Sequence, residues 1–271
     1  PSSAKHPDNW SGWPENRRFA LVLTHDVDTQ KGHDHCLRLM EIEKDKGFFS
    51  SFNIVPDRYR VSPEILSNLK SNDFEVGVHD LNHDGKLFKN EKIFRYRAEK
   101  INEYLRDWDC VGFRAGAMHC NLEWIHLLNI EYDASTFDID PFEAKPVNRR
   151  TIFPFLVRAN ANTKDIVELP YTLPQDFTLF VLMREKGIDL WKKKLDWIAG
   201  HGGMVLINTH TDYMNFAGGT LGPEEYPVQF YEEFLDYIKS KYAGQFWHVL
   251  PRDMARFCRE NGNCLQTLDV Q

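Results

Sequence analysis

The chain alternates between short apolar runs and longer amphipathic segments, and this alternation limits the folds that are open to it. Strand-like runs are expected at residues 19–24, 49–55, 74–79, 110–114, 131–135, 165–169, 204–209 and 246–250. Helical patterns lie between them, at 34–46, from Ser62 onward, and at 89–107, 121–129, 188–200, 224–241 and 251–260. Strands that are joined by helices pair in parallel through right-handed crossovers. The sequence therefore predicts an α/β protein, a closed or nearly closed (β/α) barrel of seven or eight parallel strands rather than an open sheet.

No internal repeat, low-complexity tract or long linker divides the 271 residues. We expect one barrel domain over residues 1–271, in which residues 1–17 form an extended, polar lead-in. Two connections are long for a compact domain. Residues 138–165 are predicted to form either a flap near the barrel mouth or a surface excursion without a role, and residues 212–227 to form part of the rim.

Composition argues against several classes of partner. A net charge of −7 and a pI near 5.9 disfavour non-specific binding to nucleic acid or to anionic membranes. No apolar run approaches the roughly 18 to 20 residues that membrane insertion requires. The five cysteines include no C-x-x-C pair and are expected to be free thiols: Cys36, Cys110, Cys120, Cys258 and Cys264. With no visible signal peptide, they predict a cytoplasmic protein, although a chain that begins at Pro1 leaves a missing start open.

Acidic and histidine side chains directly follow three of the predicted strands. Asp26 and Asp28 follow the first, His79 and His83 the third, and His210 the seventh. Because parallel strands end at the same edge of a sheet, these side chains are expected to meet at one mouth of the barrel. One aspartate and two histidines form a three-ligand set that leaves a metal with a position open for water. The pattern predicts a metal site with one position open for water.

Two features of this pattern have simpler explanations. Paired aspartates at a strand end also occur in solvated turns and as helix N-caps. A pair of histidines four residues apart, such as His79 and His83, is weak evidence when taken alone. Asp26 and Asp28 share a face if the chain is extended there, which favours a cation or a division of labour between ligand and base.

Five segments, in this order, resemble the motifs of the polysaccharide deacetylases, the NodB-homology or carbohydrate esterase family 4 group. They are Thr24-His25-Asp26-Val27-Asp28, His79 to His83, Gly112 to Gly116, Tyr132 to Ser135 and Leu206 to His210. The resemblance spans about residues 19 to 211 and is closest to the bacterial branch that is associated with surface-polysaccharide biosynthesis, such as that of O-antigen. It implies a distorted (β/α) barrel, often of seven strands.

The resemblance also implies a metal. Asp28, His79 and His83 match the metal triad of the family, for which a divalent transition metal, zinc first, is the expected cofactor. The familiar first motif has adjacent aspartates, whereas here Val27 separates them. Which of Asp26 and Asp28 is the ligand therefore stays open, with Asp28 preferred.

Four further residues match catalytic positions. Asp26 corresponds to the general base and His210 to the general acid. Asp133 corresponds to the carboxylate that orients that histidine and raises its pKa, and Arg114 to the arginine that keeps the base ionised. The third motif usually has proline where this chain has Gly116, so its loop is expected to be reshaped.

These roles imply the metal-dependent removal of N-acetyl groups from an amino sugar of a bacterial surface polysaccharide or its precursor. The implied partner is a carbohydrate substrate. Two alternatives stay open: an amidohydrolase of the same fold that acts on another non-peptide C–N bond, such as that of a cyclic amide or ureide, and a catalytically silent carbohydrate-binding barrel. The sequence does not indicate the sugar, its linkage or carrier, protein partners or the oligomeric state.

Overall fold

The computed structural model describes residues 2–8, 10–140, 142, 150–158, 164–261 and 266–270. Its strands are β1 (Phe19–Val27), β2 (Ser51–Ile54), β3 (Glu75–His79), β4 (Gly112–Arg114), β5 (Tyr132–Asp133), β6 (Phe155–Arg158), β7 (Ile166–Glu168), β8 (Met204–His210), β9 (Met214–Asn215), β10 (Tyr226–Pro227), β11 (Phe246–His248) and β12 (Gln266–Asp269). Its α-helices are α1 (Gln30–Asp45), α2 (Pro63–Ser71), α3 (Glu91–Asp107), α4 (Asp189–Gly200), α5 (Val228–Tyr242) and α6 (Pro251–Glu260).

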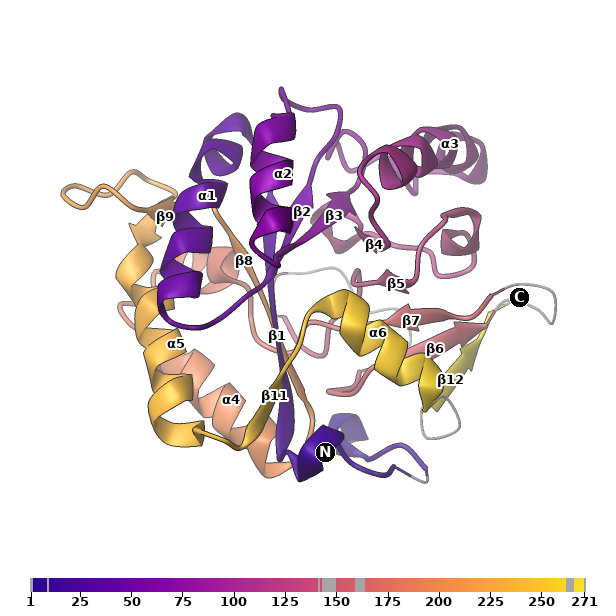
Figure 1. Cartoon of the computed structure of the whole chain (residues 1–271). Coiled ribbons are helices and arrows are strands. Elements are labelled where there is room, and N and C mark those ends of the chain that lie inside the picture. Colours follow the sequence, from indigo (N-terminus) through magenta and orange to yellow (C-terminus); the bar gives the residue numbers. More distant parts are fainter. Residues whose placement is uncertain are drawn as a thin grey trace.

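The strands form a curled, mostly parallel sheet with helices packed around its outside (Figure 1). Parallel pairing runs through β8, β1, β2, β3, β4, β5 and β7, which agrees with the predicted number of barrel strands. β11 pairs with the start of β1, on the edge whose later part pairs with β2. All eight predicted strands are present, and the predicted fold class is confirmed. The sequence pattern missed β6, which is antiparallel to β7, and β12 beside it.

A seam between β8 and the chain around β6 and β7 completes the ring. Among the described residues, main-chain hydrogen bonds rather than a strand ladder join its two sides. Thr172 N donates to Leu206 O at 2.9 Å, and Met204 N donates to Ile152 O at 2.7 Å. The strands of the ring are therefore regularly paired among the described residues except at this seam.

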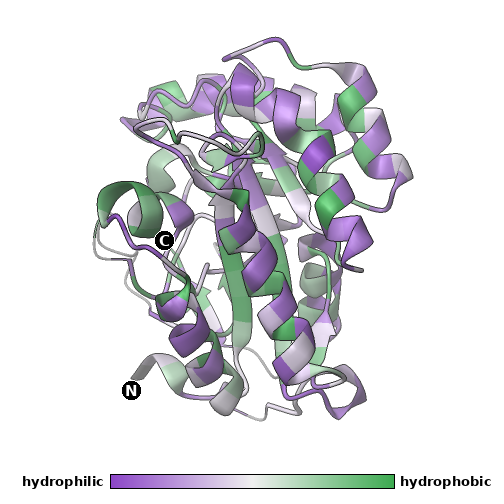
Figure 2. Ribbon diagram, turned by 90° about the vertical axis from the view of Figure 1, so that its left-hand side faces the viewer, coloured by the Kyte–Doolittle hydropathy of each residue, from purple (hydrophilic) through white to green (hydrophobic). Residues whose placement is uncertain are grey.

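The helices cover the sheet through apolar faces, as their sequences predict. In α3 the buried residues Phe94, Ala98, Ile101 and Leu105 recur at intervals of three and four. Asn90 caps this helix, because its side chain accepts a hydrogen bond from Ile93 N at 2.9 Å. In Figure 2 the long central strand is largely hydrophobic, while the helices in front of it carry both hydrophobic and hydrophilic residues. No described helix has both the length and the apolar character needed to cross a membrane.

The helix predicted at residues 121–129 is wrong. The structure has only a short 3₁₀ turn, Ile125–Leu127, within a set of turns. The buried residues Leu122, Ile125 and Leu128 recur every three residues, which suits a 3₁₀ turn better than the 3.6-residue period of an α-helix.

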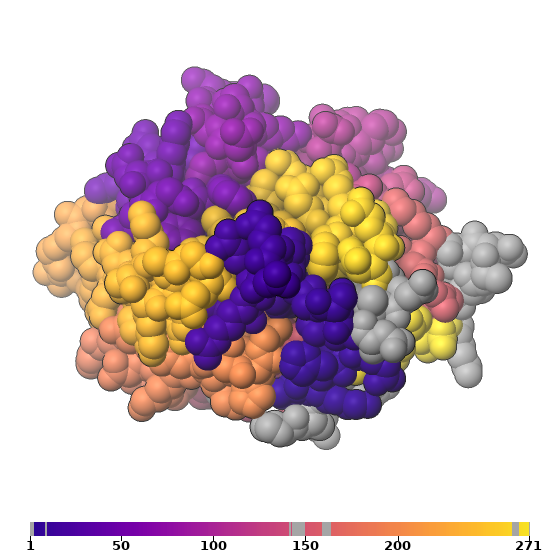
Figure 3. Space-filling view, turned by 60° about the horizontal axis from the view of Figure 1, so that its bottom comes forward, coloured from indigo at the N-terminus to yellow at the C-terminus, as the bar shows by residue number. Residues whose placement is uncertain are grey.

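The N-terminal segment lies across the end of the barrel opposite to the strand C-termini (Figure 3). Trp13 is buried, and its indole nitrogen donates to Gly202 O at 2.8 Å. Its ring stacks on Phe153 at 6.5 Å between centroids and lies 6.1 Å from Trp247. Aromatic packing of this kind closes the bottom of the ring.

The two long connections differ in how far they are described. In residues 138–165, positions 141, 143–149 and 159–163 lie outside the described residues, and with them most of the predicted flap. Asp138 Oδ2 forms an ion pair with Lys194 Nζ of α4 at 2.5 Å, which holds the start of this connection against the helix. The other connection, residues 212–227, contains β9 and β10 and ends where Pro227 precedes α5.

Glu75, at the start of β3, provides a test of the buried polar packing. Its carboxylate accepts from Tyr132 Oη at 2.8 Å and from Arg252 N at 3.0 Å, and burial raises its pKa to about 7. A carboxyl whose pKa is higher in the folded state stabilises fully only below its unfolded pKa. That contribution is lost as the pH rises through about 7.

We expect Glu75→Gln, which resembles the protonated carboxyl, to remove this loss. Relative to the variant, the wild type should lose up to about 3 kcal/mol of unfolding free energy between pH 4.5 and 8. Urea unfolding across this range measures the difference. Parallel curves for the two proteins would show that folding does not raise the pKa of Glu75.

Candidate metal and acid–base site

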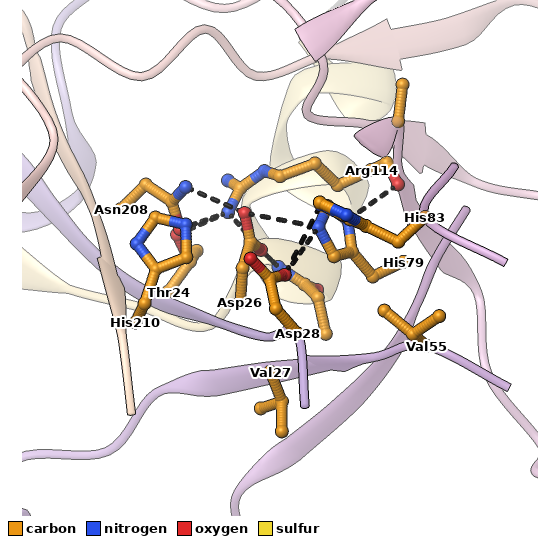
Figure 4. A network of polar contacts seen from close by, with 12 residues as sticks. Thr24, Asp26, Val27, Asp28, Val55, His79, His83, Arg114, Asn208 and His210 are labelled. Atoms are coloured by element: carbon orange, nitrogen blue, oxygen red, sulfur yellow. Dashed lines mark hydrogen bonds and ion pairs between the residues drawn. The ribbon is translucent and has the colours of Figure 1, made fainter. Parts of the chain in front are cut away.

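The predicted site residues meet at the C-terminal ends of the barrel strands. Register places Asp26 of β1 directly opposite His210 of β8. Asp28 follows β1, and His79 ends β3. Figure 4 shows His210 on one side of the two aspartates and the pair His79 and His83 on the other. A cavity of about 180 Å³ is lined by Asp26, Asp28, His79, His83, Ala117, Met118, Gln175, Phe177, His210 and Tyr213.

Asp28, His79 and His83 form a three-ligand cluster. One ligand atom from each lies within 4.8 Å of the others. Asp28 Oδ1 is 3.3 Å from His79 Nε2 and 3.4 Å from His83 Nε2, and it is buried without a hydrogen-bond partner among the described residues. A buried carboxylate oxygen facing two imidazole nitrogens is a donor set that suits a divalent transition metal. The residues present therefore fit the metal that the sequence motifs imply.

The histidine rings are oriented by their other nitrogens. His79 Nδ1 lies 3.0 Å from the carbonyl oxygen of Arg114, so it carries the proton and leaves Nε2 for the cluster. Arg58 donates to His83 Nδ1 at 2.7 Å and to His83 O at 3.1 Å. Binding a cation through His83 Nε2 would move the ring proton to Nδ1, so Arg58 would then keep only its bond to the carbonyl oxygen. Burial and the charge of His79 lower the pKa of His83, which favours the neutral ring that a metal requires.

Asp26 is held as a carboxylate by donors on both oxygens. Arg114 Nη1 donates to Oδ1 at 3.0 Å, and the amides Asn53 and Asn208 donate to Oδ1 and Oδ2 at 2.9 and 2.7 Å. Burial alone would raise the pKa of Asp26. The charges of Arg114, His79 and His210 outweigh it and hold that pKa well below its usual range. Asp26 is therefore ionised at any ordinary pH, while its oxygens are less free than those of Asp28 to bind a cation.

His210 is oriented by Asp176 and not by Asp133, so the predicted partner was wrong. His210 Nδ1 lies 2.7 Å from Asp176 Oδ1, and Asp176 Oδ2 accepts from His210 N at 2.8 Å. Burial opposes protonation of the ring, but the charge of Asp176 raises the pKa of His210 to about 10. His210 is therefore poised as an acid, with Nε2 left for the cavity.

Asp133 lies behind the site, at the end of β5. It accepts from Ser135 Oγ at 2.6 Å, and Ser135 Oγ in turn accepts from Ala115 N at 2.8 Å. Glu168 pairs with it across β5 and β7, and burial raises the pKa of both carboxyls. The strand register explains the difference: β5 and β8 are not neighbours, whereas Asp176 lies beyond β7, next to the seam with β8. Asp133 thus supports the loop that follows Arg114.

Gly116 is needed where the third motif usually has proline. A Cβ atom at this position would lie 2.6 Å from Asp80 Oδ2 and 3.0 Å from the ring of His83. Both neighbours belong to the segment that delivers the metal ligands. The absence of a side chain at Gly116 therefore lets the third motif approach the cluster closely.

Aromatic side chains near the strand ends and in the rim connections could stack on sugar faces, but few of them reach the cavity. Phe177 and Tyr213 line it, and their rings lie 5.0 Å apart. Phe137 and Tyr171 are buried and stack on each other at 5.4 Å. Tyr213 also lines an adjoining cavity of about 370 Å³, so the connection at 212–227 contributes to the rim, as predicted.

Sequence reasoning missed three polar residues that complete the site, namely Asn53, Asn208 and Asp176. Asn208 lies within a motif that was recognised, and strand alternation could have placed it on the same face as His210. Asn53 lies beside Asp26 in the register of β1 and β2. Asp176 directly precedes a short π-helix, η5 (Phe177–Leu182), which no periodic pattern announces.

Solved structures with this fold include polysaccharide deacetylases. One from Mycobacterium smegmatis, provisionally assigned as such, has a TM-score of 0.71 and 17% identity over 98% of each chain. Another from Pseudomonas aeruginosa PAO1, also provisionally assigned, has a TM-score of 0.69 and 16% identity over 94% of each. Puue allantoinase has a TM-score of 0.68 and 15% identity over 94% of each. No protein-family model matches the sequence, and no curated protein matches it. At these identities the likenesses establish the fold, which is that of the family the motifs resemble.

We expect Asp176→Asn to lower the pKa of His210 from about 10 toward its ordinary value, because the neighbouring charge is lost. An NMR titration of the His210 ring in metal-free protein measures this change. Asp133→Asn is the matched control, and it should leave the titration of His210 in place. An equal shift in both variants would refute the pairing of His210 with Asp176.

Proposed function

We propose that this protein is a metal-dependent hydrolase that removes N-acetyl groups from an amino sugar of a bacterial surface polysaccharide or its precursor. The observation that carries the proposal is the arrangement within one cavity. A three-ligand cluster shares this cavity with an ionised aspartate, Asp26, and with a protonated histidine, His210, which lies on the other side of the aspartates from His79 and His83. Amide hydrolysis needs a proton acceptor for water and a proton donor for the leaving amine. The neighbouring deacetylase folds support the choice of an acetamide.

Each side chain has a role that follows from its contacts. Asp28, His79 and His83 would hold the cation, with zinc as the first candidate. When bound, such a cation polarises the scissile carbonyl group and acidifies water. Asp26 accepts the proton of the attacking water and is aligned for this by Arg114. His210 gives its proton to the departing nitrogen from Nε2, because Nδ1 is committed to Asp176. Asp176 stabilises the protonated ring in the ground state.

The cavity limits which part of the substrate enters. A volume of about 180 Å³, with Met118, Phe177 and Tyr213 among its walls, suits a small acyl group and part of one sugar ring. The rest of a sugar chain would extend into the adjoining cavity of about 370 Å³. The free thiols among the described cysteines support a cytoplasmic location, where a lipid- or nucleotide-linked precursor would be the available substrate.

A second candidate function is the hydrolysis of another non-peptide C–N bond, such as that of a ureide. The likeness to an allantoinase over 94% of both chains favours it, because that neighbour is nearly as similar as the deacetylases. The same base, acid and ligands would serve either reaction. The products distinguish them, since only deacetylation releases acetate.

We expect the purified protein to bind about one equivalent of zinc or a similar metal and to release acetate from N-acetylated amino sugars. The His79→Ala, His83→Ala double variant should lose both properties, because one ligand cannot hold the cation. Elemental analysis and an acetate assay measure these changes. A matched double variant, His119→Ala, His201→Ala, changes two histidines that do not line the cavity and should retain metal and activity.

Three results would redirect the proposal. Wild-type protein that binds no metal after reconstitution would refute the metal mechanism. Metal binding with turnover of ureides alone would favour the second candidate. Metal binding with turnover of neither class would favour a catalytically silent carbohydrate-binding barrel.

A further inference from the structure

Asp212 is a buried carboxylate that lies two residues beyond His210 and takes no direct part in the proposed reaction. β1 and β8 run parallel in a register that pairs Asp26 with His210. Asp28 and Asp212 are therefore the residues that follow the same pair of strands out of the sheet. Their side chains have different surroundings, since Asp28 faces the two histidines while Asp212 faces the main chain of Asp28.

Asp212 makes three hydrogen bonds to the turn that carries Asp28. Its Oδ2 accepts from Asp28 N at 2.9 Å, and its Oδ1 accepts from Thr29 N at 2.9 Å and from Thr29 Oγ1 at 2.5 Å. Thr29 is the N-cap residue of α1, but its own side chain makes no capping bond within the helix. The distant carboxylate thus satisfies N–H groups at a helix start, where negative charge is favourable.

Gly32 provides the space for this carboxylate. A Cβ atom on Gly32 would overlap both oxygens and the carboxyl carbon of Asp212. Gly32 lies in the first turn of α1, where glycine weakens a helix relative to alanine. The stability that α1 loses through this glycine is offset by the hydrogen bonds that the Asp212 carboxylate makes in the space left free. Two observations, the three hydrogen bonds and the absence of a Cβ atom at Gly32, therefore indicate that Asp212 holds the turn in place. We call this contact of Asp212 with Asp28 and Thr29 the clamp.

Asp28 needs such a contact more than the site residues that lie within strands do. Asp26, His79 and His210 lie within strands, so sheet pairing fixes their main chains. Asp28 lies just past the end of β1, where the ladder no longer holds it. If the backbone of Asp28 could rotate, its carboxylate would no longer be held facing His79 and His83.

We propose that Asp212 is the positioning residue of the candidate metal centre, and that it fixes the main chain of Asp28 and Thr29 without binding the cation itself. The inference rests on the metal site of the proposed function. It makes the metal affinity depend on a contact outside the ligand set, between the segment that follows β8 and the turn between β1 and α1. Positioning contacts behind metal ligands commonly change affinity by about 10- to 100-fold.

The test is the affinity for Zn²⁺ alone, measured by competition with a chromophoric chelator. Asp212→Asn should bind zinc about 10- to 100-fold more weakly. Two variants change no charge: Thr29→Val removes one of the three bonds, and Gly32→Ala pushes the carboxylate away. Both should also weaken binding, Thr29→Val by a few-fold and Gly32→Ala by about tenfold.

Glu224→Gln is the matched control. Glu224 lines the adjoining cavity and makes no hydrogen bond to the turn among the described residues, and the substitution removes one negative charge, as Asp212→Asn does. Its affinity should stay within about twofold of the wild type. If zinc binding weakened in Asp212→Asn but not in Thr29→Val or Gly32→Ala, the effect would be one of charge alone, and the clamp would be refuted. Wild-type affinity in all variants would overturn it as well, with the metal site intact. Wild-type protein without zinc would instead refute the proposed metal centre, and the clamp with it. If Asp212→Asn does not fold, the two uncharged variants decide.

Discussion

The parallel pairing of β1 with β8 is the constraint on which the site depends. It holds for seven consecutive residue pairs, from Ala20 with Met204 to Asp26 with His210. Side chains alternate along β1, so Asp26 points into the barrel while His25 points outward. There His25 is within 3.0 Å of Glu43 of α1 and 2.7 Å of Thr209. A slip of one residue would put His25 in the cavity and Asp26 among the helices.

The barrel interior holds a charge that would be costly without its partners. Arg114 is fully buried, and it contacts the carboxylate of Asp26, the side chains of Thr24 and Asn208, and the carbonyl oxygen of Ala134. A buried guanidinium is tolerated when it is paired and hydrogen-bonded. The same pairing keeps Asp26 ionised, so a single contact meets both the stability requirement of the core and the chemical requirement of the site.

Prediction from the sequence succeeded where strand ends carry distinctive residues. Asp28, His79 and His83 come together because parallel strands share an edge. It failed where the structure follows no period. Asp176 precedes a π-helix in a connection without a periodic pattern, and the resemblance to the family motifs assigned its role to Asp133 at the end of β5. Residues 121–129 were misread because a three-residue spacing resembles a short stretch of helical pattern. The contact between Asp212 and the turn after Asp28 joins positions that are distant along the chain, which no local pattern records.

The seam beside β8 has a consequence for how a fold of this kind can diversify. From β8 through β1 to β5 and β7, each strand is locked by ladder pairing, so an inserted residue would displace one functional group against the next. At the seam, isolated bonds such as Thr172 N to Leu206 O leave the circumference adjustable. Insertions and deletions beside this seam can therefore leave the ligand geometry undisturbed, provided that Asp176 keeps its contact with His210. A protein with this fold can therefore change the segments that line one side of the site, and with them its substrate preference, while the residues of the proposed reaction stay in place.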